Sequence, residues 1–323
     1  MRYFVTGGAG FIGSNYVEHL FENVNELTGI TIFDKFTYAA NPRNYEKYLA
    51  DPRLEVIKGD ICDMSLLAES MKNHDFVIHF AAESHVDRSI EDASIFIRTN
   101  ILGTFNVLES SRKSGIKTTI HVSTDEVYGS LPSGLANETY PLLPNSPYAA
   151  SKAASDLLAR SYFVTHGLDV RITRCCNNYG KYQFPDKVIP VFIHKLISGQ
   201  KLPIYGNGSN VREWIDVADH AFGIQCALEN GAPGEIYNIG SRTHLSNNEL
   251  AKQIIGISGR ENQMTEYVQD RKGHDLRYAL DSKKIEDLGF MVRTNFTDGL
   301  KETFDWYAAN PNWWSKSDSE TKL

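Results

Sequence analysis

Two adjacent carboxylates, Asp125 and Glu126, follow a run of strand-forming residues in the segment HVSTDEVYG. Neighbouring like charges repel each other, and each of them resists burial. This repulsion favours a state in which one carboxyl group keeps its proton while the other is ionised. Such a pair can supply a general acid and a general base side by side. A solvated acidic turn is the alternative, so the chemistry of the pair depends on its surroundings.

A tyrosine and a lysine, Tyr148 and Lys152, stand four residues apart in the predicted helix SPYAASKAASDLLARSYFVTHG. Residues at this spacing share a helix face. We expect the ammonium to stabilise the phenolate and to lower the tyrosine pKa from its ordinary value of about 10. A phenolate can accept a hydroxyl proton while hydride leaves for a nicotinamide cofactor. An exposed aromatic–lysine pair is the alternative interpretation.

The opening segment VTGGAGFIG contains a G-x-G-x-x-G pattern between a predicted strand and a predicted helix. Such glycines allow a tight turn and let backbone amides approach a pyrophosphate at the helix N-terminus. Asp34 ends the next strand-like run about 20 residues later, where a carboxylate would bond the ribose hydroxyls of NAD. The pattern therefore predicts NAD binding rather than a merely structural turn. The adjacent Lys35 bears on the choice between NAD and NADP.

Strand-like runs such as GITIFD, LEVIKGDI, DFVIHFAA and TTIHVST alternate with helix-like stretches. This alternation predicts an α/β fold with a Rossmann-like, doubly wound parallel sheet that binds ligands at the carboxyl ends of its strands. We expect an NAD-binding domain over residues 1–176, to which about 213–240 return. The later sequence is rich in Gly, Pro, Asn and Arg, which predicts a smaller mixed α/β substrate-binding domain over 177–323.

Composition narrows the class of protein. In the 323 residues, 41% hydrophobic and 23% charged content are typical of a soluble globular protein. A formal charge of −7 argues against broad nucleic-acid binding, which needs a basic face. No apolar run has the length of a membrane span, and MRYFVTGGAG does not resemble a secretory signal. The four cysteines lack metal-ligand spacing, so we expect a cytoplasmic protein with reduced thiols and no bound metal. The hydrophilic segment 315–323 is expected to be mobile.

The glycine loop, the strand-end Ser–Thr and the Tyr-x-x-x-Lys motif together resemble the extended short-chain dehydrogenase/reductase superfamily over essentially the whole chain. More narrowly, the segments STDEVYG, RCCNNYGKYQFPDKVIP, LPIYGNGSNVREWIDVADH and DRKGHDLRYALD resemble the dTDP-glucose 4,6-dehydratase family. In the related nucleotide-sugar 4-epimerases, the segment after the Ser–Thr strand end generally lacks the acidic pair. Two minor departures from the family pattern are KYQ, where a proline commonly follows the glycine, and CC before the asparagines.

This resemblance implies conversion of dTDP-glucose to dTDP-4-keto-6-deoxyglucose plus water. Oxidation at carbon 4 would acidify the carbon 5 proton, elimination across carbons 5 and 6 would follow, and hydride would return to carbon 6. The resemblance assigns Glu126 as the base at carbon 5 and Asp125 as the acid toward the carbon 6 hydroxyl. Tyr148 would take the carbon 4 hydroxyl proton with support from Lys152, and Thr124 would hydrogen-bond the carbon 4 oxygen. NAD would be regenerated in each turnover and stay bound.

The resemblance also implies two sets of contacts, and the arginines among them suit a diphosphate because guanidinium binds it bidentately. The cofactor contacts are expected from Gly7, Gly10, Phe11, Ile12, Gly13, Asp34, Lys35, Thr37, Asp60, Ile61, Ala81, Ala82, Ser84, Thr99, Tyr148, Lys152 and Asn178. The substrate contacts are expected from Ser84, Thr124, Asn177, Lys187, Val188, Pro203, Tyr205, Arg212, Asn247, Arg271 and His274.

Two rival functions stay open at this point. A nucleotide-sugar 4-epimerase on the same fold would change stereochemistry and leave the mass unchanged. A non-catalytic NAD-binding sensor would be expected to lack the tyrosine, the lysine or the carboxylates. The helices predicted within ASIFIRTNILGTFNVLESSRK and PYAASKAASDLLARSYF commonly form a dimer interface in this superfamily, so we expect a homodimer. The base preference of dTDP against UDP cannot be read from the residues.

Overall fold

A seven-stranded sheet organises the larger part of the computed structural model, which describes residues 1–260 and 265–313. Its order is β10-β6-β5-β4-β1-β2-β3, and every neighbouring pair is parallel. The strands are β1 (Arg2–Thr6), β2 (Gly29–Asp34), β3 (Leu54–Lys58), β4 (Phe76–His79), β5 (Thr118–Thr124), β6 (Val170–Cys175) and β10 (Ile236–Ile239). The chain order reverses between β1 and β4, which is where a doubly wound sheet binds its ligand.

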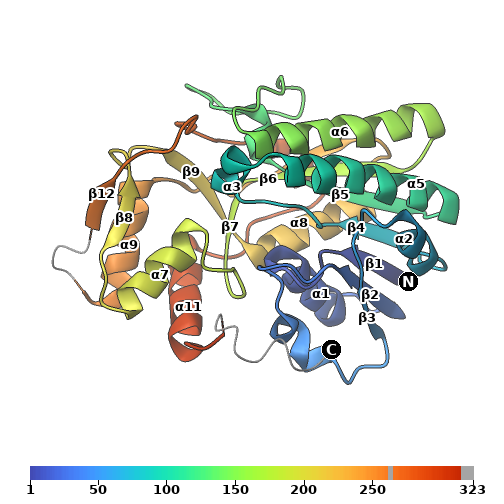
Figure 1. Cartoon of the computed structure of the whole chain (residues 1–323), viewed down its shortest axis with the longest axis horizontal. Helices are drawn as coiled ribbons and strands as arrows, with labels where there is room; N and C mark the ends of the chain where they lie inside the picture. The colour runs from blue at the N-terminus through green and yellow to red at the C-terminus, as the bar shows by residue number, and fades with distance from the viewer. Residues whose placement is uncertain (261–264, 314–323) are drawn as a thin grey trace.

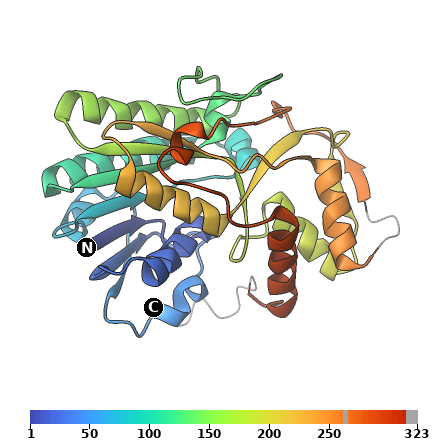
Figure 2. The ribbon, with the colours of Figure 1, turned by 180° about the vertical axis from the view of Figure 1, so that it is seen from behind.

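Helices cover both faces of this sheet (Figures 1 and 2). Helix α5 packs against both α2 and α6 on one face, and α1 packs against α8 on the other. The helical elements of this part are α1 (Phe11–Asn23), η1 (Pro42–Tyr48), α2 (Met64–Ser70), α3 (Val86–Glu91), α4 (Ser94–Phe96), the π-helical η2 (Ile97–Gly103), α5 (Thr104–Ser114), η3 (Asp125–Tyr128), α6 (Pro147–His166) and α8 (Val217–Asn230). The predicted Rossmann-like fold class is confirmed.

The remaining elements form a smaller part at the end of the sheet where the strands terminate (Figure 1). Apart from the short helix α10 (Lys283–Glu286), which packs against β10 and α8 of the larger part, they are β7 (Asn177–Tyr179), α7 (Val188–Ile197), β8 (Leu202–Tyr205), β9 (Val211–Asp216), β11 (His244–Ser246), α9 (Asn247–Ser258), β12 (Thr265–Val268) and α11 (Phe296–Ala309). The strands make two small sheets, β11-β9-β7 and β12-β8. Helices α7, α9 and α11 enclose a separate apolar core around Phe192, Trp214 and Tyr307.

The segment 213–240, which is expected to return to the first domain, divides between the two parts. Strand β10 pairs with β6 at the edge of the large sheet, whereas β9 pairs with β7 and β11 in a small sheet. We propose that residues 1–176 together with α8 and β10 form one domain; the boundary at residue 176 stays a prediction. The segment 315–323 lies outside the described residues. Among the residues described, none of the helices could cross a membrane.

Helix α6, which carries the tyrosine and the lysine, begins and ends where its sequence indicates. The Ser146 hydroxyl accepts a hydrogen bond from the backbone N–H of Ala149, and Pro147 occupies the first turn. Gly167 ends the helix in the left-handed conformation, with φ of 67°. These two caps fix the register of the helix, so Tyr148 lies in its first turn beside the carboxyl end of β5.

Candidate active site

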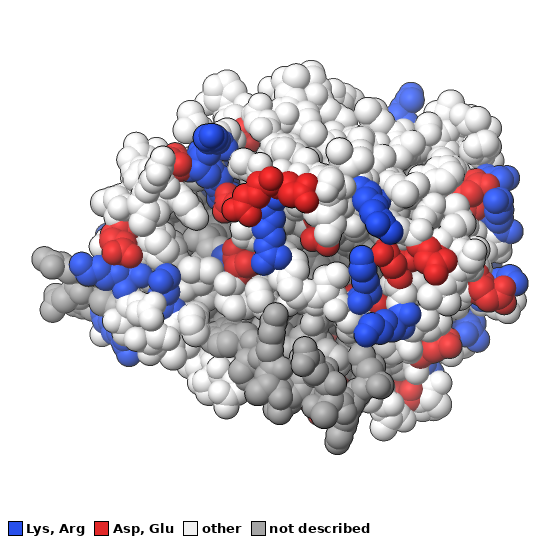
Figure 3. All heavy atoms as spheres, viewed as in Figure 1, with Lys and Arg blue, Asp and Glu red and all other residues white. Residues whose placement is uncertain are grey.

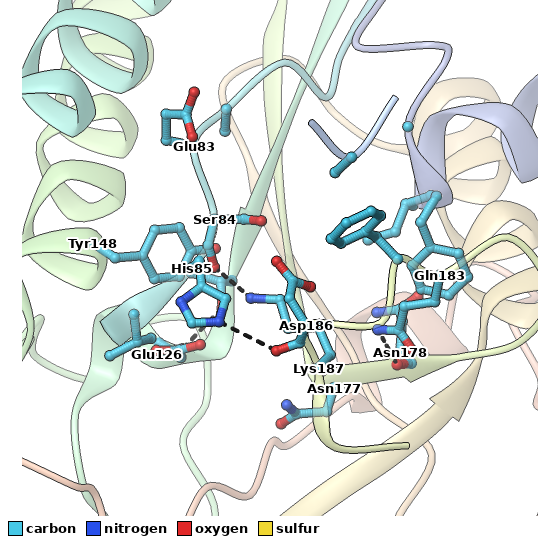
Figure 4. Close-up of a pocket in the computed structure, with 18 of the residues that line it drawn as sticks. Glu83, Ser84, His85, Glu126, Tyr148, Asn177, Asn178, Gln183, Asp186 and Lys187 are labelled. Atoms are coloured by element: carbon cyan, nitrogen blue, oxygen red, sulfur yellow. Dashed lines mark hydrogen bonds between the residues drawn. The ribbon is translucent and has the colours of Figure 1, made fainter. Parts of the chain in front are cut away.

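A cavity of about 600 Å³ opens at the carboxyl ends of the parallel strands, between the large sheet and the smaller part. It is lined by the glycine loop, by strand ends and by loops of the second half of the chain (Figure 4). The structure brings the predicted catalytic, cofactor and substrate residues together here. The exception is Asp125, whose side chain is buried and does not line the cavity.

Some glycines of the glycine loop lack room for a side chain because protein atoms lie too close to them. A Cβ on Gly13 would lie 2.3 Å from the backbone oxygen of Gly7, and Gly7 has φ of +71°. A Cβ on Gly10 would meet nothing closer than 3.4 Å. Gly10 lines the cavity at the N-terminus of α1, so its missing side chain leaves room for a ligand rather than for protein. The loop therefore fits a dinucleotide pyrophosphate.

Backbone N–H groups hold the acidic partner of this loop. The Asp34 carboxylate accepts from Ala9 at 3.0 Å and from Phe36 at 2.8 Å. Its burial raises the pKa of the carboxyl group. The neighbouring Lys35 forms an ion pair with Asp60 at 2.8 Å. Because that ammonium already has a carboxylate partner, the site fits the ribose hydroxyls of NAD better than the extra phosphate of NADP.

The tyrosine and lysine differ from expectation in their electrostatics. Lys152 Nζ donates to the backbone oxygen of Val122 at 2.8 Å, and burial lowers the lysine pKa to about 8. Burial, followed by the charge of Glu126, raises the pKa of Tyr148 well above its ordinary value. The predicted lowering of the Tyr148 pKa is therefore wrong for this structure. Desolvation is the largest influence on both groups, and it disfavours the charged form of each.

The acidic pair occupies the short η3 turn directly after β5. The Thr124 hydroxyl accepts from the Glu126 N–H at 3.2 Å and donates to Asp125 Oδ1 at 3.2 Å. Burial and then the Glu126 charge raise the pKa of Asp125 well above its usual range. Burial also raises the pKa of Glu126, but the Lys187 and Arg212 charges act in the opposite direction. The two neighbours thus have different environments, with Asp125 favouring its protonated form.

Cationic side chains from the smaller part face these carboxylates. Lys187 Nζ donates to the backbone oxygen of Ser84 at 2.7 Å, which joins the two sides of the cavity (Figure 4). Arg212 lies over the Tyr278 ring at 4.3 Å, and Arg271 lies 5.4 Å from the ring of Tyr205. The charges and donor groups of these three cations suit a diphosphate group.

Comparison with known proteins places this geometry in a family. The family model described as GDP-mannose 4,6 dehydratase matches residues 4–303. A curated dTDP-glucose 4,6-dehydratase of Actinoplanes sp. is 48% identical over 320 residues, which cover 98% of this chain and 100% of the relative. The crystal structure of DesIV, a dTDP-glucose 4,6-dehydratase of Streptomyces venezuelae with NAD and TYD bound, has a TM-score of 0.96 at 51% identity and covers 98% of this chain and 99% of its own. The chain belongs to the dTDP-glucose 4,6-dehydratase family.

The fold of this dehydratase family is also found in nucleotide-sugar 4-epimerases. A UDP-glucose 4-epimerase of Thermotoga maritima, solved with UDP-glucose, has a TM-score of 0.89 at 28% identity, with 96% of this chain and 100% of that chain covered. The overall fold is therefore shared between dehydratase-family and epimerase structures. The arrangement of the elements alone therefore does not distinguish the two activities.

Several residues that line this dehydratase-family cavity are not predicted from the sequence. His85 Nε2 lies 3.2 Å from the backbone oxygen of Asp186, and Tyr38 lies under the Arg88 guanidinium at 3.6 Å. His85 follows the end of β4, so its position at a carboxyl strand end could have indicated it. Tyr38 and Asp186 give no such signal because their contacts join distant parts of the chain. Further unpredicted lining residues include Glu83, Asp87, Gln183, Phe184, His220, Asp275 and Tyr278.

Proposed function

We propose that this protein is an NAD-dependent hydro-lyase that converts dTDP-glucose to dTDP-4-keto-6-deoxyglucose and water. The single observation that carries the proposal is the Asp125–Glu126 pair at the end of β5, which lies beside Tyr148 and Lys152 above a dinucleotide loop. This arrangement provides the three proton-handling groups that oxidation followed by elimination requires. The names of the full-length relatives support the same substrate.

The reaction begins with proton transfer at carbon 4. Tyr148 accepts the proton of the carbon 4 hydroxyl, and the Lys152 ammonium stabilises the phenolate that this requires. Thr124 hydrogen-bonds the carbon 4 oxygen and thereby keeps the carbon 4 hydroxyl close to Tyr148. The glycine loop and Asp34 would hold NAD, which would supply a hydride acceptor for carbon 4 and, once reduced, a hydride donor for carbon 6.

The elimination that follows uses the two carboxyl groups in different protonation states. Glu126 lines the cavity among cationic side chains, and we assign it as the base that removes the carbon 5 proton. Burial favours the protonated form of Asp125. Its side chain lies behind the residues that line the cavity, but its Oδ2 makes no hydrogen bond within the described residues. We assign this carboxyl group as the acid that protonates the departing carbon 6 hydroxyl. The carbon 6 hydroxyl leaves as water with the proton of Asp125, while Glu126 holds the proton taken from carbon 5. Atoms balance because Glu126 can return its proton to carbon 5, and the proton that Tyr148 took from the carbon 4 hydroxyl restores Asp125. A proton redelivered at carbon 5 completes the product.

The nucleotide part of the substrate extends into the smaller part of the molecule. Arg212 and Arg271 bind the diphosphate, with Lys187 as a third cation, and Tyr205 lines the same cavity for the base. Asn177 has a buried side-chain oxygen without a partner among the described residues, which suits it to a hydroxyl of the ligand. We propose dTDP rather than UDP as the carrier, in line with the names of the relatives.

A homodimer and a cytoplasmic location complete the proposal. Elements η2, α5 and α6 expose large apolar side chains, namely Ile97, Leu102, Phe105, Leu157 and Val164. A second copy of this chain would bury them on association. Light scattering should give twice the monomer mass, and a monomer at working concentration would contradict the dimer. Figure 3 shows acidic and basic side chains interspersed on the face viewed, rather than the continuous basic surface of a nucleic-acid-binding protein.

The decisive experiment uses purified protein with dTDP-glucose and no added cofactor, followed by mass spectrometry of the sugar nucleotide. Loss of one water would establish dehydration and tightly held NAD. Unchanged mass calls for repetition with added NAD and with UDP-glucose. A change in sugar stereochemistry alone would move the assignment to a 4-epimerase, and complete inertness would contradict both.

A further inference from the structure

A third ionisable residue, Asp156, lies on the same face of helix α6 as Tyr148 and Lys152. Asp156 stands four residues after Lys152, as Lys152 does after Tyr148, and this spacing places all three on one helix face. Asp156 is 1% exposed and Lys152 is 4% exposed. A buried carboxylate so close to the reacting groups requires a reason, because an unmatched buried charge is strongly destabilising.

Side chains from two strands of the large sheet contact this carboxylate. Arg174 Nε on β6 donates to Asp156 Oδ2 at 2.8 Å, and His121 Nε2 on β5 lies 3.3 Å from Oδ1. Arg174 in turn donates to the Tyr128 hydroxyl at 2.9 Å, and that hydroxyl donates to Asn238 Oδ1 at 2.8 Å. The carboxylate therefore has one fixed orientation, with the oxygen nearer His121 making no well-aligned hydrogen bond.

The other titratable groups around Lys152 are largely uncharged. Burial lowers the pKa values of His79 on β4 and His121 on β5, so both rings are neutral at pH 7. Burial raises the pKa of Tyr128 to about 12, so its hydroxyl keeps its proton. Element η2 presents the neutral side chain of Asn100 to α6. On the cavity side, Asp125 and Glu126 of η3 act on Tyr148.

We propose that Asp156 is a positioning residue for the oxidation step, whose fixed carboxylate offsets the buried Arg174 charge so that Lys152 can remain an ammonium beside Tyr148. With Asp156 ionised, the charges of Arg174 and Asp156 cancel, and the Lys152 ammonium remains available to stabilise negative charge that forms on Tyr148 during the oxidation. Without it, Arg174 would repel the ammonium inside the protein. Burial lowers the Lys152 pKa, and Asp156 is the group that acts in the opposite direction. This role rests on the proposed function, because it serves the proton transfer to Tyr148.

Asp156→Asn tests the inference, with Asp169→Asn as its matched control. Asp169 also pairs with an arginine of β6, since Arg171 Nη2 donates to it at 2.8 Å, but the control pair is more exposed and lies at the other end of the strand. In the holoenzyme, Lys152 is titrated by NMR of its labelled ε-carbon and identified by loss of the signal in Lys152→Arg. We expect Asp156→Asn to move both this titration and the alkaline limb of the rate profile to lower pH by about one pH unit. We expect Asp169→Asn to leave the Lys152 titration and the alkaline limb unchanged. Asp156→Glu should show a smaller shift of both than Asp156→Asn does.

An Asp156→Asn enzyme that loses activity equally at every pH, with Lys152 titrating as in the wild type, would overturn the inference and leave Asp156 a structural role. If that variant does not fold, Arg174→Gln provides the opposite test. Removing the competing cation should move the Lys152 titration to higher pH, and a shift to lower pH or no shift would overturn the inference. Because the NMR titration needs no substrate, it separates this outcome from a failure of the dehydratase assignment.

Discussion

The cofactor side and the substrate side of the cavity are built in different ways. On the cofactor side, regular elements and backbone groups hold the residues: two backbone N–H groups bind Asp34, and the glycine loop joins β1 to α1. On the substrate side, side chains hold one another, both across the cavity and within a single loop. Arg271 lies 3.5 Å from Asp87, and His274 Nδ1 lies 2.6 Å from Asp270. The cofactor side is therefore preorganised by the fold, whereas the substrate side depends on polar contacts that a bound diphosphate must replace or extend.

The largest effect is expected where the two sides meet, at Glu126. Glu126→Gln should lower dehydration by about 10²–10⁴-fold, because an amide cannot remove the carbon 5 proton. Oxidation at carbon 4 should still occur, so that reduced cofactor accumulates in a single turnover. The measurement is near-ultraviolet absorbance together with product mass. Glu69→Gln, at an exposed position on α2, is the control. Dehydration at the wild-type rate in Glu126→Gln would show that Glu126 is not the base.

Two glycine substitutions sharpen the claim that the cofactor side is preorganised. Gly13→Ala places a Cβ against a backbone oxygen that cannot move aside, and should destabilise the protein by about 1–3 kcal/mol. Gly10→Ala meets no close protein atom, so it should retain thermal stability but lose bound NAD. Thermal unfolding and the cofactor content of the purified protein separate the two effects. Retention of NAD by a stable Gly10→Ala protein would mean that the pyrophosphate does not approach this glycine.

Much of the cofactor side can be predicted from local sequence, since helix caps, glycines and strand ends act over a few residues. Ser146, Pro147 and Gly167 are enough to indicate both ends of α6. The direction of the Tyr148 pKa shift cannot be predicted in this way, because it depends on how deeply two groups are buried and on the Lys152 bond to a backbone oxygen. Asp186 escapes prediction for a related reason, since its contact with His85 joins segments about one hundred residues apart.

On the substrate side, we expect Arg271→Lys to weaken binding of the sugar nucleotide. A lysine keeps the charge but loses the planar fork that binds a diphosphate in two places. We expect KM for the sugar nucleotide to rise by roughly tenfold, equivalent to about 1.4 kcal/mol, while NAD content and kcat change little. Arg277→Lys is the matched control, because Arg277 is near in sequence but donates to the backbone oxygen of Gly134. An equal rise in KM for both variants would indicate a general loss of loop structure rather than lost diphosphate binding.

The smallest effect is a gain in stability at Asp125, the predicted site residue that lies behind the cavity wall. Its folded-state pKa is raised by burial, so its favourable contribution is fully present below the unfolded pKa and is lost as pH rises through the folded value. Asp125→Asn removes the ionisation and should stabilise the protein by about 1 kcal/mol near pH 8, with the gain disappearing as pH is lowered. Differential scanning fluorimetry across pH measures this, with the exposed Asp305→Asn as control. Since the same substitution removes the proposed acid, stability and dehydration should change in opposite directions. Since the amide oxygen can still accept from the Thr124 hydroxyl, a variant that is less stable at every pH would mean that burying the amide NH2 group in place of Oδ2 costs more than burying the charge.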